Sequence, residues 1–172
     1  MKSTFPITLS PAIRTYLLIG LSFLSFAVPF AFSGSQLITG TIVNCFLFLS
    51  AFLFPRKYFL PLIVLPSLAT ITRGIVFGPA TPFLFYFLPF IWLANYSLIY
   101  VFTKMVKSKI TYSHLLLPSL VKWLILFISA NIYFKFSLVP RLFLQTMGIY
   151  QFITACLGGL AALFIYKKVF RG

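Results

Sequence analysis

Six long apolar stretches, separated by short polar breaks, constrain this chain more than any other feature of its sequence. A helix needs about 20 mostly apolar residues to cross the hydrocarbon core of a bilayer. The breaks carry Gly, Pro, Ser or basic residues, which favour turns. The third stretch is the most interrupted. We therefore expect an all-α integral membrane bundle of six transmembrane helices, one domain over residues 1–172 in the cell membrane, with these spans: Tyr16–Phe32, Leu37–Phe54, Tyr58–Phe77, Pro82–Thr103, Ser113–Phe134 and Ile149–Tyr166.

The chain contains no Asp or Glu, although it has 14 Lys and Arg. Charged residues make up 8% of it, against about a quarter in soluble domains. Without carboxylates there is no paired-acid hydrolysis, no Ser-His-Asp triad and no carboxylate-ligated metal. We expect no enzymatic activity, no cofactor and no metal site.

The basic residues divide unequally between alternate breaks. One side of the membrane receives three, Arg73, Lys135 and Arg141. Because Lys and Arg accumulate in cytoplasmic loops, both termini are expected in the cytoplasm. Such dispersed groups are typical of membrane proteins and not of a nucleic-acid interface, so the bilayer is the expected partner. The cytoplasmic side receives ten: Lys2, Arg14, Arg56, Lys57, Lys104, Lys107, Lys109, Lys167, Lys168 and Arg171.

Lys122 is the most informative polar residue at membrane depth, about nine residues into the fifth stretch. A charge at that depth is costly unless it has partners. One interpretation is a lysine whose amine reaches the membrane surface. The other is an interior lysine that contacts a substrate, or carbonyls and water, in a cavity.

Other polar residues leave similar alternatives open. Arg73 either binds lipid phosphate at the outer surface or recognises an anion at the mouth of a pocket. Asn44, Asn95 and Asn131 either fix helix packing through hydrogen bonds or contact a ligand. Three glutamines, Gln36, Gln145 and Gln151, lie where they would close an outward-facing pocket.

Several segments resemble the substrate-binding (S) components of energy-coupling factor (ECF) transporters, which are six-span chains of this length without an ATPase motif. Besides the lone Lys122, they cover residues 36–44 (QLITGTIVN), 65–68 (LPSL), 89–95 (PFIWLAN) and 151–155 (QFITA). The resemblance implies capture of a vitamin or other small metabolite near the outer face. It also implies docking on a transmembrane coupling subunit driven by two ATPases.

Taken together, these residues predict a substrate-capture subunit of an importer. The expected substrate-binding residues are Asn44, Arg73, Asn95, Lys122 and Gln151, and the two basic side chains favour a substrate with negative charge. The alternative is a non-catalytic membrane scaffold or assembly subunit without a ligand, in which the same polar residues serve helix packing alone.

Overall fold

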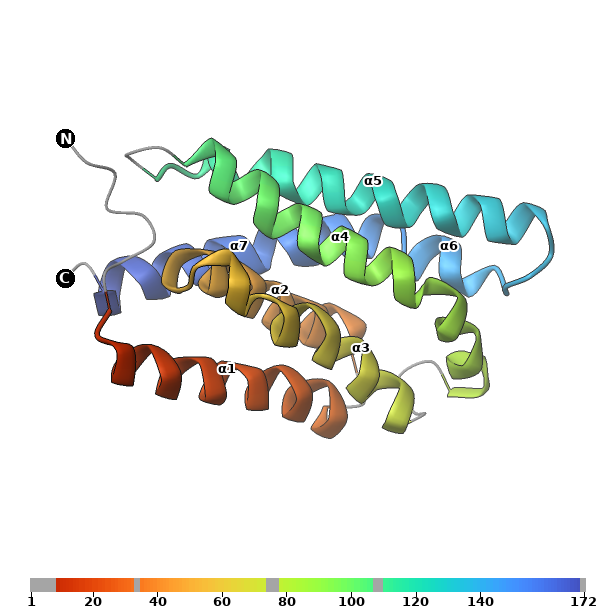
Figure 1. Ribbon diagram of the computed structural model, residues 1–172. Helices are drawn as coiled ribbons and strands as arrows, with labels where there is room; N and C mark the ends of the chain where they lie inside the picture. Colours follow the sequence, from red (N-terminus) through yellow and green to blue (C-terminus); the bar gives the residue numbers. More distant parts are fainter. Residues whose placement is uncertain (1–8, 33–34, 74–77, 107–109, 171–172) are drawn as a thin grey trace.

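The computed structural model describes residues 9–32, 35–73, 78–106 and 110–170, without the side chains at positions 73 and 78. These residues form a bundle of roughly parallel and antiparallel helices (Figure 1). The long helices are α1 (Pro11–Ala31), α2 (Gln36–Leu53), α3 (Leu60–Arg73), α4 (Leu84–Met105), α5 (Ser113–Lys135) and α7 (Ile149–Phe170). Three shorter elements lie between them: the 3₁₀ helices η1 (Arg56–Tyr58) and η2 (Gly78–Phe83), and α6 (Leu142–Thr146).

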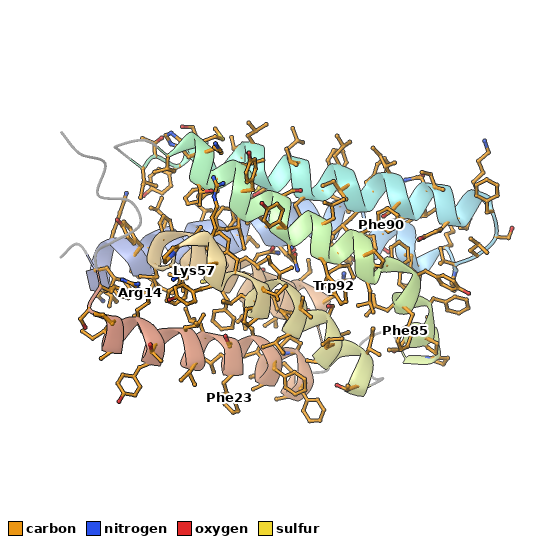
Figure 2. The ribbon with its side chains drawn as sticks, viewed as in Figure 1. Arg14, Phe23, Lys57, Phe85, Phe90 and Trp92 are labelled. Carbon is orange, nitrogen blue, oxygen red and sulfur yellow. The ribbon has the colours of Figure 1, made fainter. Side chains whose placement is uncertain are left out.

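The all-helical prediction is confirmed for the described residues, and five helical stretches there are long and apolar enough to cross a membrane. They are Pro11–Ala31, Gln36–Leu53, Pro79–Met105, Ser113–Lys135 and Leu142–Phe170. Their outward faces are apolar; Phe23, for example, points away from the bundle and is 67% exposed (Figure 2). Such faces are suited to lipid and not to water, as in a multi-pass membrane protein.

The third expected span, Tyr58–Phe77, is not among these five. Its described helix, α3, has 14 residues, about 21 Å at 1.5 Å per residue. The chain first forms η1, and α3 begins at Leu60, directly before Pro61, because proline suits the first turn of a helix. Residues 74–77 lie outside the described part of the chain.

The other boundaries shift by a few residues for local reasons. The helix α1 begins before the expected Tyr16 because Ser10 caps it, its Oγ accepting a hydrogen bond from the Ile13 amide (3.4 Å), and Pro11 occupies its first turn. The expected break at Lys135–Thr146 contains the short helix α6. At Gly148, an added Cβ would lie 2.2 Å from the Leu144 carbonyl oxygen, so only glycine permits the sharp turn from α6 into α7.

The helices pack in pairs, α2 along α7, α4 along α5 and α1 along α3. Consecutive long helices run in opposite directions, so α1 begins and α7 ends at the same end of the bundle (Figure 1). We call this the basic end, since it carries Arg14, Arg56, Lys57, Lys104, Lys167 and Lys168; Arg14 and Lys57 are labelled in Figure 2. The opposite end carries Lys135 and Arg141.

Two separate apolar cores fill the bundle. One lies toward the basic end, around Phe48, Phe52, Phe102 and Tyr166, whose rings stack or meet edge to face. The other lies toward the opposite end and contains Leu84, Phe87, Ala94, Leu126, Ala130, Val139, Phe143 and Met147. The layer between these two cores holds the buried polar residues Asn44, Asn95 and Lys122.

Candidate functional site

Lys122 lies inside the bundle, with 3% of its surface exposed. Its Nζ donates hydrogen bonds to Oδ1 of Asn44 on α2 (2.6 Å) and to Oδ1 of Asn95 on α4 (2.7 Å). These distances are as short as those of charge-assisted hydrogen bonds. The interior alternative therefore describes this lysine, and its ammonium joins three helices near the middle of the bundle.

Both asparagines are held in place by their amide nitrogens. Asn44 Nδ2 donates to the Gly40 carbonyl (2.9 Å) and to Thr154 Oγ1 on α7 (3.2 Å). Asn95 Nδ2 donates to the Ile63 carbonyl on α3 (3.1 Å). These bonds leave each Oδ1 facing the lysine, whereas the reversed amides would place N–H groups against an ammonium.

A close approach of α2 and α7 sets the position of Asn44. A Cβ added to Gly158 would lie 2.6 Å from Asn44 Cβ and from the Thr41 carbonyl oxygen. Glycine at this position lets the two backbones pack together, and that packing brings Thr154 within reach of the Asn44 amide. The polar layer therefore depends on a backbone contact as well as on its own hydrogen bonds.

A cavity of about 100 Å³ adjoins this layer and extends toward the opposite end of the bundle. It has several times the roughly 10–15 Å³ that one water requires. Half of the residues that line it have polar side chains, although most of the exposed wall surface is apolar. They are Gln36, Thr39, Asn44, Ser67, Thr70, Asn95, Lys122 and Gln151, alternating with apolar residues that include Val43, Pro66, Leu84, Ile91, Leu126 and Met147.

Two glutamines lie at the end of this cavity that is farther from Lys122. Gln36 Nε2 on α2 and Gln151 Nε2 on α7 both donate to the carbonyl of Thr146, over 2.7 and 3.2 Å. Each side chain is half-buried. Each keeps its Oε1 and its second Nε2 hydrogen, so these amides retain polar capacity for a molecule in the cavity.

The described lining of the cavity has one cationic side chain and no anionic one. Lys122 is the only titratable residue among those described there, and the chain has no carboxylate side chain to pair with it. Two of the three ammonium hydrogens bond the asparagines, and the third has no acceptor among the residues that the structure describes. A buried charge without a counter-ion is costly, so this arrangement suits an anion that enters from outside the protein.

Of the five expected substrate-binding residues, the structure brings four to this cavity: Asn44, Asn95, Lys122 and Gln151. The side chain of Arg73 lies outside the described residues. Asn131 is exposed on the far side of α5, where its Nδ2 bonds the Phe127 carbonyl of its own helix. Gln145 is also exposed and donates to the Tyr150 hydroxyl.

Sequence reasoning missed the hydroxyl residues of the site, Thr39, Ser67, Thr70 and Thr154. A signal for them was present in the helical spacing. Gln36, Thr39, Gly40, Val43 and Asn44 recur at the intervals of one helix face, and all of them line the cavity. Gln151 and Thr154 repeat the three-residue interval on α7, and Ser67 and Thr70 repeat it on α3.

The residues that line the cavity do not include Trp92, Tyr96 or His114. Trp92 donates its indole N–H to Ser67 Oγ (2.8 Å) and so links α4 to α3 (Figure 2). Tyr96 stacks on Tyr100 at an exposed position. His114 Nδ1 bonds Thr111 at the start of α5. No group of three or more metal-ligating side chains occurs in the described ranges.

Comparisons with models of protein families, with curated proteins and with solved structures find no match for this chain.

Proposed function

We propose that this protein is a membrane-embedded substrate-capture subunit of an importer for a vitamin or another small metabolite. The single observation that supports the proposal best is the cavity at mid-bundle, where buried Lys122 has an ammonium hydrogen without an acceptor among the described residues. A residue that only ties helices together needs no cavity beside it. The resemblance to the S components of ECF transporters points to the same class of protein.

The proposed topology has six passes with both termini in the cytoplasm. The helix α2 ends at the basic end, whereas α4 begins at the opposite end (Figure 1). In the proposed topology, the segment that contains α3 would cross the membrane, although α3 itself is short. The basic end would face the cytoplasm of a cell membrane, as the distribution of Lys and Arg favours.

This orientation makes the cavity accessible from outside the cell. Gln36, Thr70 and Gln151 line its outer part and are half-buried. Toward the cytoplasm, the apolar core around Phe48, Phe52 and Phe102 closes the bundle below the polar layer. A subunit with this shape binds its substrate from outside and requires a conformational change to release it inside.

The energy for uptake would come from other subunits. The sequence has no G-x-x-x-x-G-K-[ST] loop for binding nucleotide phosphates. It also has no membrane carboxylate for direct proton coupling. The proposed partners are a transmembrane coupling subunit and two ATPase subunits.

Native mass spectrometry of the tagged chain, gently solubilised from its native membranes, tests the proposal. The expected result is a bound small molecule or a complex with a coupling subunit and two ATPases. A ligand-free chain bound to proteins unrelated to transport would contradict it. That result would favour the scaffold alternative, in which the hydrogen bonds of Asn44 and Asn95 within the bundle serve packing alone.

A further inference from the structure

The charge and hydrogen-bonding capacity of the cavity indicate what kind of substrate it binds. This inference rests on the proposed function. We propose that the cavity binds a small organic monoanion that has a carboxylate and no amino group. The carboxylate bonds the third N–H of Lys122, which has no acceptor among the described residues, and the uncharged part of the molecule lies toward Gln36 and Gln151.

We infer that the substrate is negatively charged because the protein provides no counter-ion for Lys122. Lys122 is buried between neutral residues, and its two protein partners are amide oxygens. Amide dipoles stabilise an ammonium only in part, and a bound carboxylate completes its neutralisation. A carboxylate oxygen also provides the acceptor that the third ammonium hydrogen lacks.

We infer that the substrate carries a single negative charge because few hydrogen-bond donors surround the Lys122 ammonium. Within the described walls of the cavity, Lys122 is the only cation. The nearby amide nitrogens of Asn44 and Asn95 already donate within the protein. One ammonium hydrogen matches one carboxylate, whereas a phosphate dianion requires several charged or backbone donors.

We infer that the substrate has no amino group because the cavity has no anionic acceptor for one. The chain has no Asp or Glu, so no carboxylate in the cavity pairs with a substrate ammonium. A zwitterionic amino acid would bury its own cation unpaired, which costs free energy. The hydrophobic walls formed by Ile91, Leu126 and Met147 suit an uncharged chain instead.

The roles of the polar residues divide accordingly. Lys122 contacts the carboxylate. Asn44 and Asn95 are positioning residues, since their oxygens hold the ammonium and their nitrogens bond other helices. Gln36 and Gln151, each with spare amide capacity, contact the uncharged part.

Calorimetry and thermal unfolding of the full chain in lipid nanodiscs test this assignment with three matched probes: pentanoate, pentanamide and 2-aminopentanoate. Pentanoate should bind and raise the melting temperature. Pentanamide lacks the charge that pairs with Lys122, and 2-aminopentanoate adds an unpaired cation. Each should therefore bind about tenfold more weakly or worse. The assignment fails if pentanoate does not bind, or if either other probe binds as well.

Substitutions then locate the charge. Lys122→Met should weaken pentanoate binding about tenfold or more while leaving expression intact. Lys135→Met removes the same charge from an exposed position on the same helix and should leave binding unchanged. Unchanged binding in Lys122→Met would remove this lysine from the site.

The Asn44→Asp variant distinguishes a specific loss of binding from a loss caused by misfolding. The new carboxylate would lie against the Lys122 ammonium as an internal counter-ion. Its second oxygen would replace the amide N–H that bonds the Gly40 carbonyl, whereas Thr154 can turn its hydroxyl to donate to it. We expect a melting temperature close to that of the wild type without ligand, because the ion pair offsets the lost hydrogen bond, together with about tenfold weaker pentanoate binding. Retained binding of pentanoate by this variant would overturn the proposal.

The two proposals fail separately. A neutral or amine-bearing compound found on the native protein would overturn the monoanion and leave the capture function standing. A chain without any bound compound or transport partner would contradict the capture function itself.

Discussion

At the scale of single residues, helix geometry decides whether a polar side chain of α5 faces the bundle interior or the outside. Lys122 and Asn131 are nine residues apart on α5, which is about two and a half turns. They therefore lie on opposite faces of the helix. Lys122 joins three helices at the cavity, whereas Asn131 bonds only its own helix.

Asn95→Ala should destabilise the protein by about 1–3 kcal/mol, because it removes an acceptor from the buried Lys122 ammonium and a donor from the Ile63 carbonyl. Asn131→Ala is the matched control and should change stability by no more than about 0.5 kcal/mol. Unfolding of both variants in the same detergent measures the difference. Equal effects would mean that the buried network contributes no stability.

The two tryptophans provide a second matched pair. Trp92→Phe removes the hydrogen bond to Ser67 between α4 and α3 and should cost about 1 kcal/mol more than Trp123→Phe. The indole nitrogen of Trp123 is buried and has no hydrogen-bond partner in the part of the chain that the structure describes, so phenylalanine there loses no such bond. Thermal unfolding checks the order of the two variants, and a reversed order would contradict it.

At the scale of elements, the contact between α2 and α7 determines whether the polar layer can form. Gly40 and Gly158 let these helices approach closely, and Asn44 and Thr154 then meet across the contact. The contact also aligns Gln36 with Gln151, so that both reach the Thr146 carbonyl at the turn before α7. One helix pair therefore positions both ends of the cavity.

Gly158→Ala should force α2 and α7 apart, since its Cβ would lie within 2.7 Å of Asn44, Thr41 and Cys45 atoms. Overpacking of this kind costs about 1–3 kcal/mol. A Cβ added to Gly20 would have no neighbour within 4 Å, so Gly20→Ala should stabilise α1 by about 0.5–1 kcal/mol. Melting temperatures that shift in opposite directions would support the close contact; a neutral Gly158→Ala would contradict it.

At the scale of the whole molecule, the alternation of helix directions places most of the described basic residues at one end and leaves the cavity in the half nearer the other. The apolar outer faces of α1, α4, α5 and α7 complete a surface suited to lipid. With a short α3 between long neighbours, the number of passes becomes the main topological question. Labelling from one side of the membrane answers it.

Single cysteines placed in a background with Cys45→Ala and Cys156→Ala test the six-pass topology. In intact cells, a membrane-impermeant maleimide should label Lys135→Cys. It should label Lys57→Cys, Lys104→Cys and Lys168→Cys only after permeabilisation. Labelling of Lys104→Cys and Lys168→Cys from outside, with Lys57→Cys protected, would show that the α3 segment does not cross.

The sequence by itself determined the helical membrane class, most of the helix ends and the polar positions worth attention, because apolar length, turn residues and charge distribution are local properties. Four expected site residues, Asn44, Asn95, Lys122 and Gln151, meet at one cavity. Only the tertiary structure decided that Asn44 and Asn95 bond the lysine, that Asn131 faces outward and that Thr146 joins two glutamines. These outcomes depend on how the helices rotate and approach one another, and that is set by packing between residues distant in the chain.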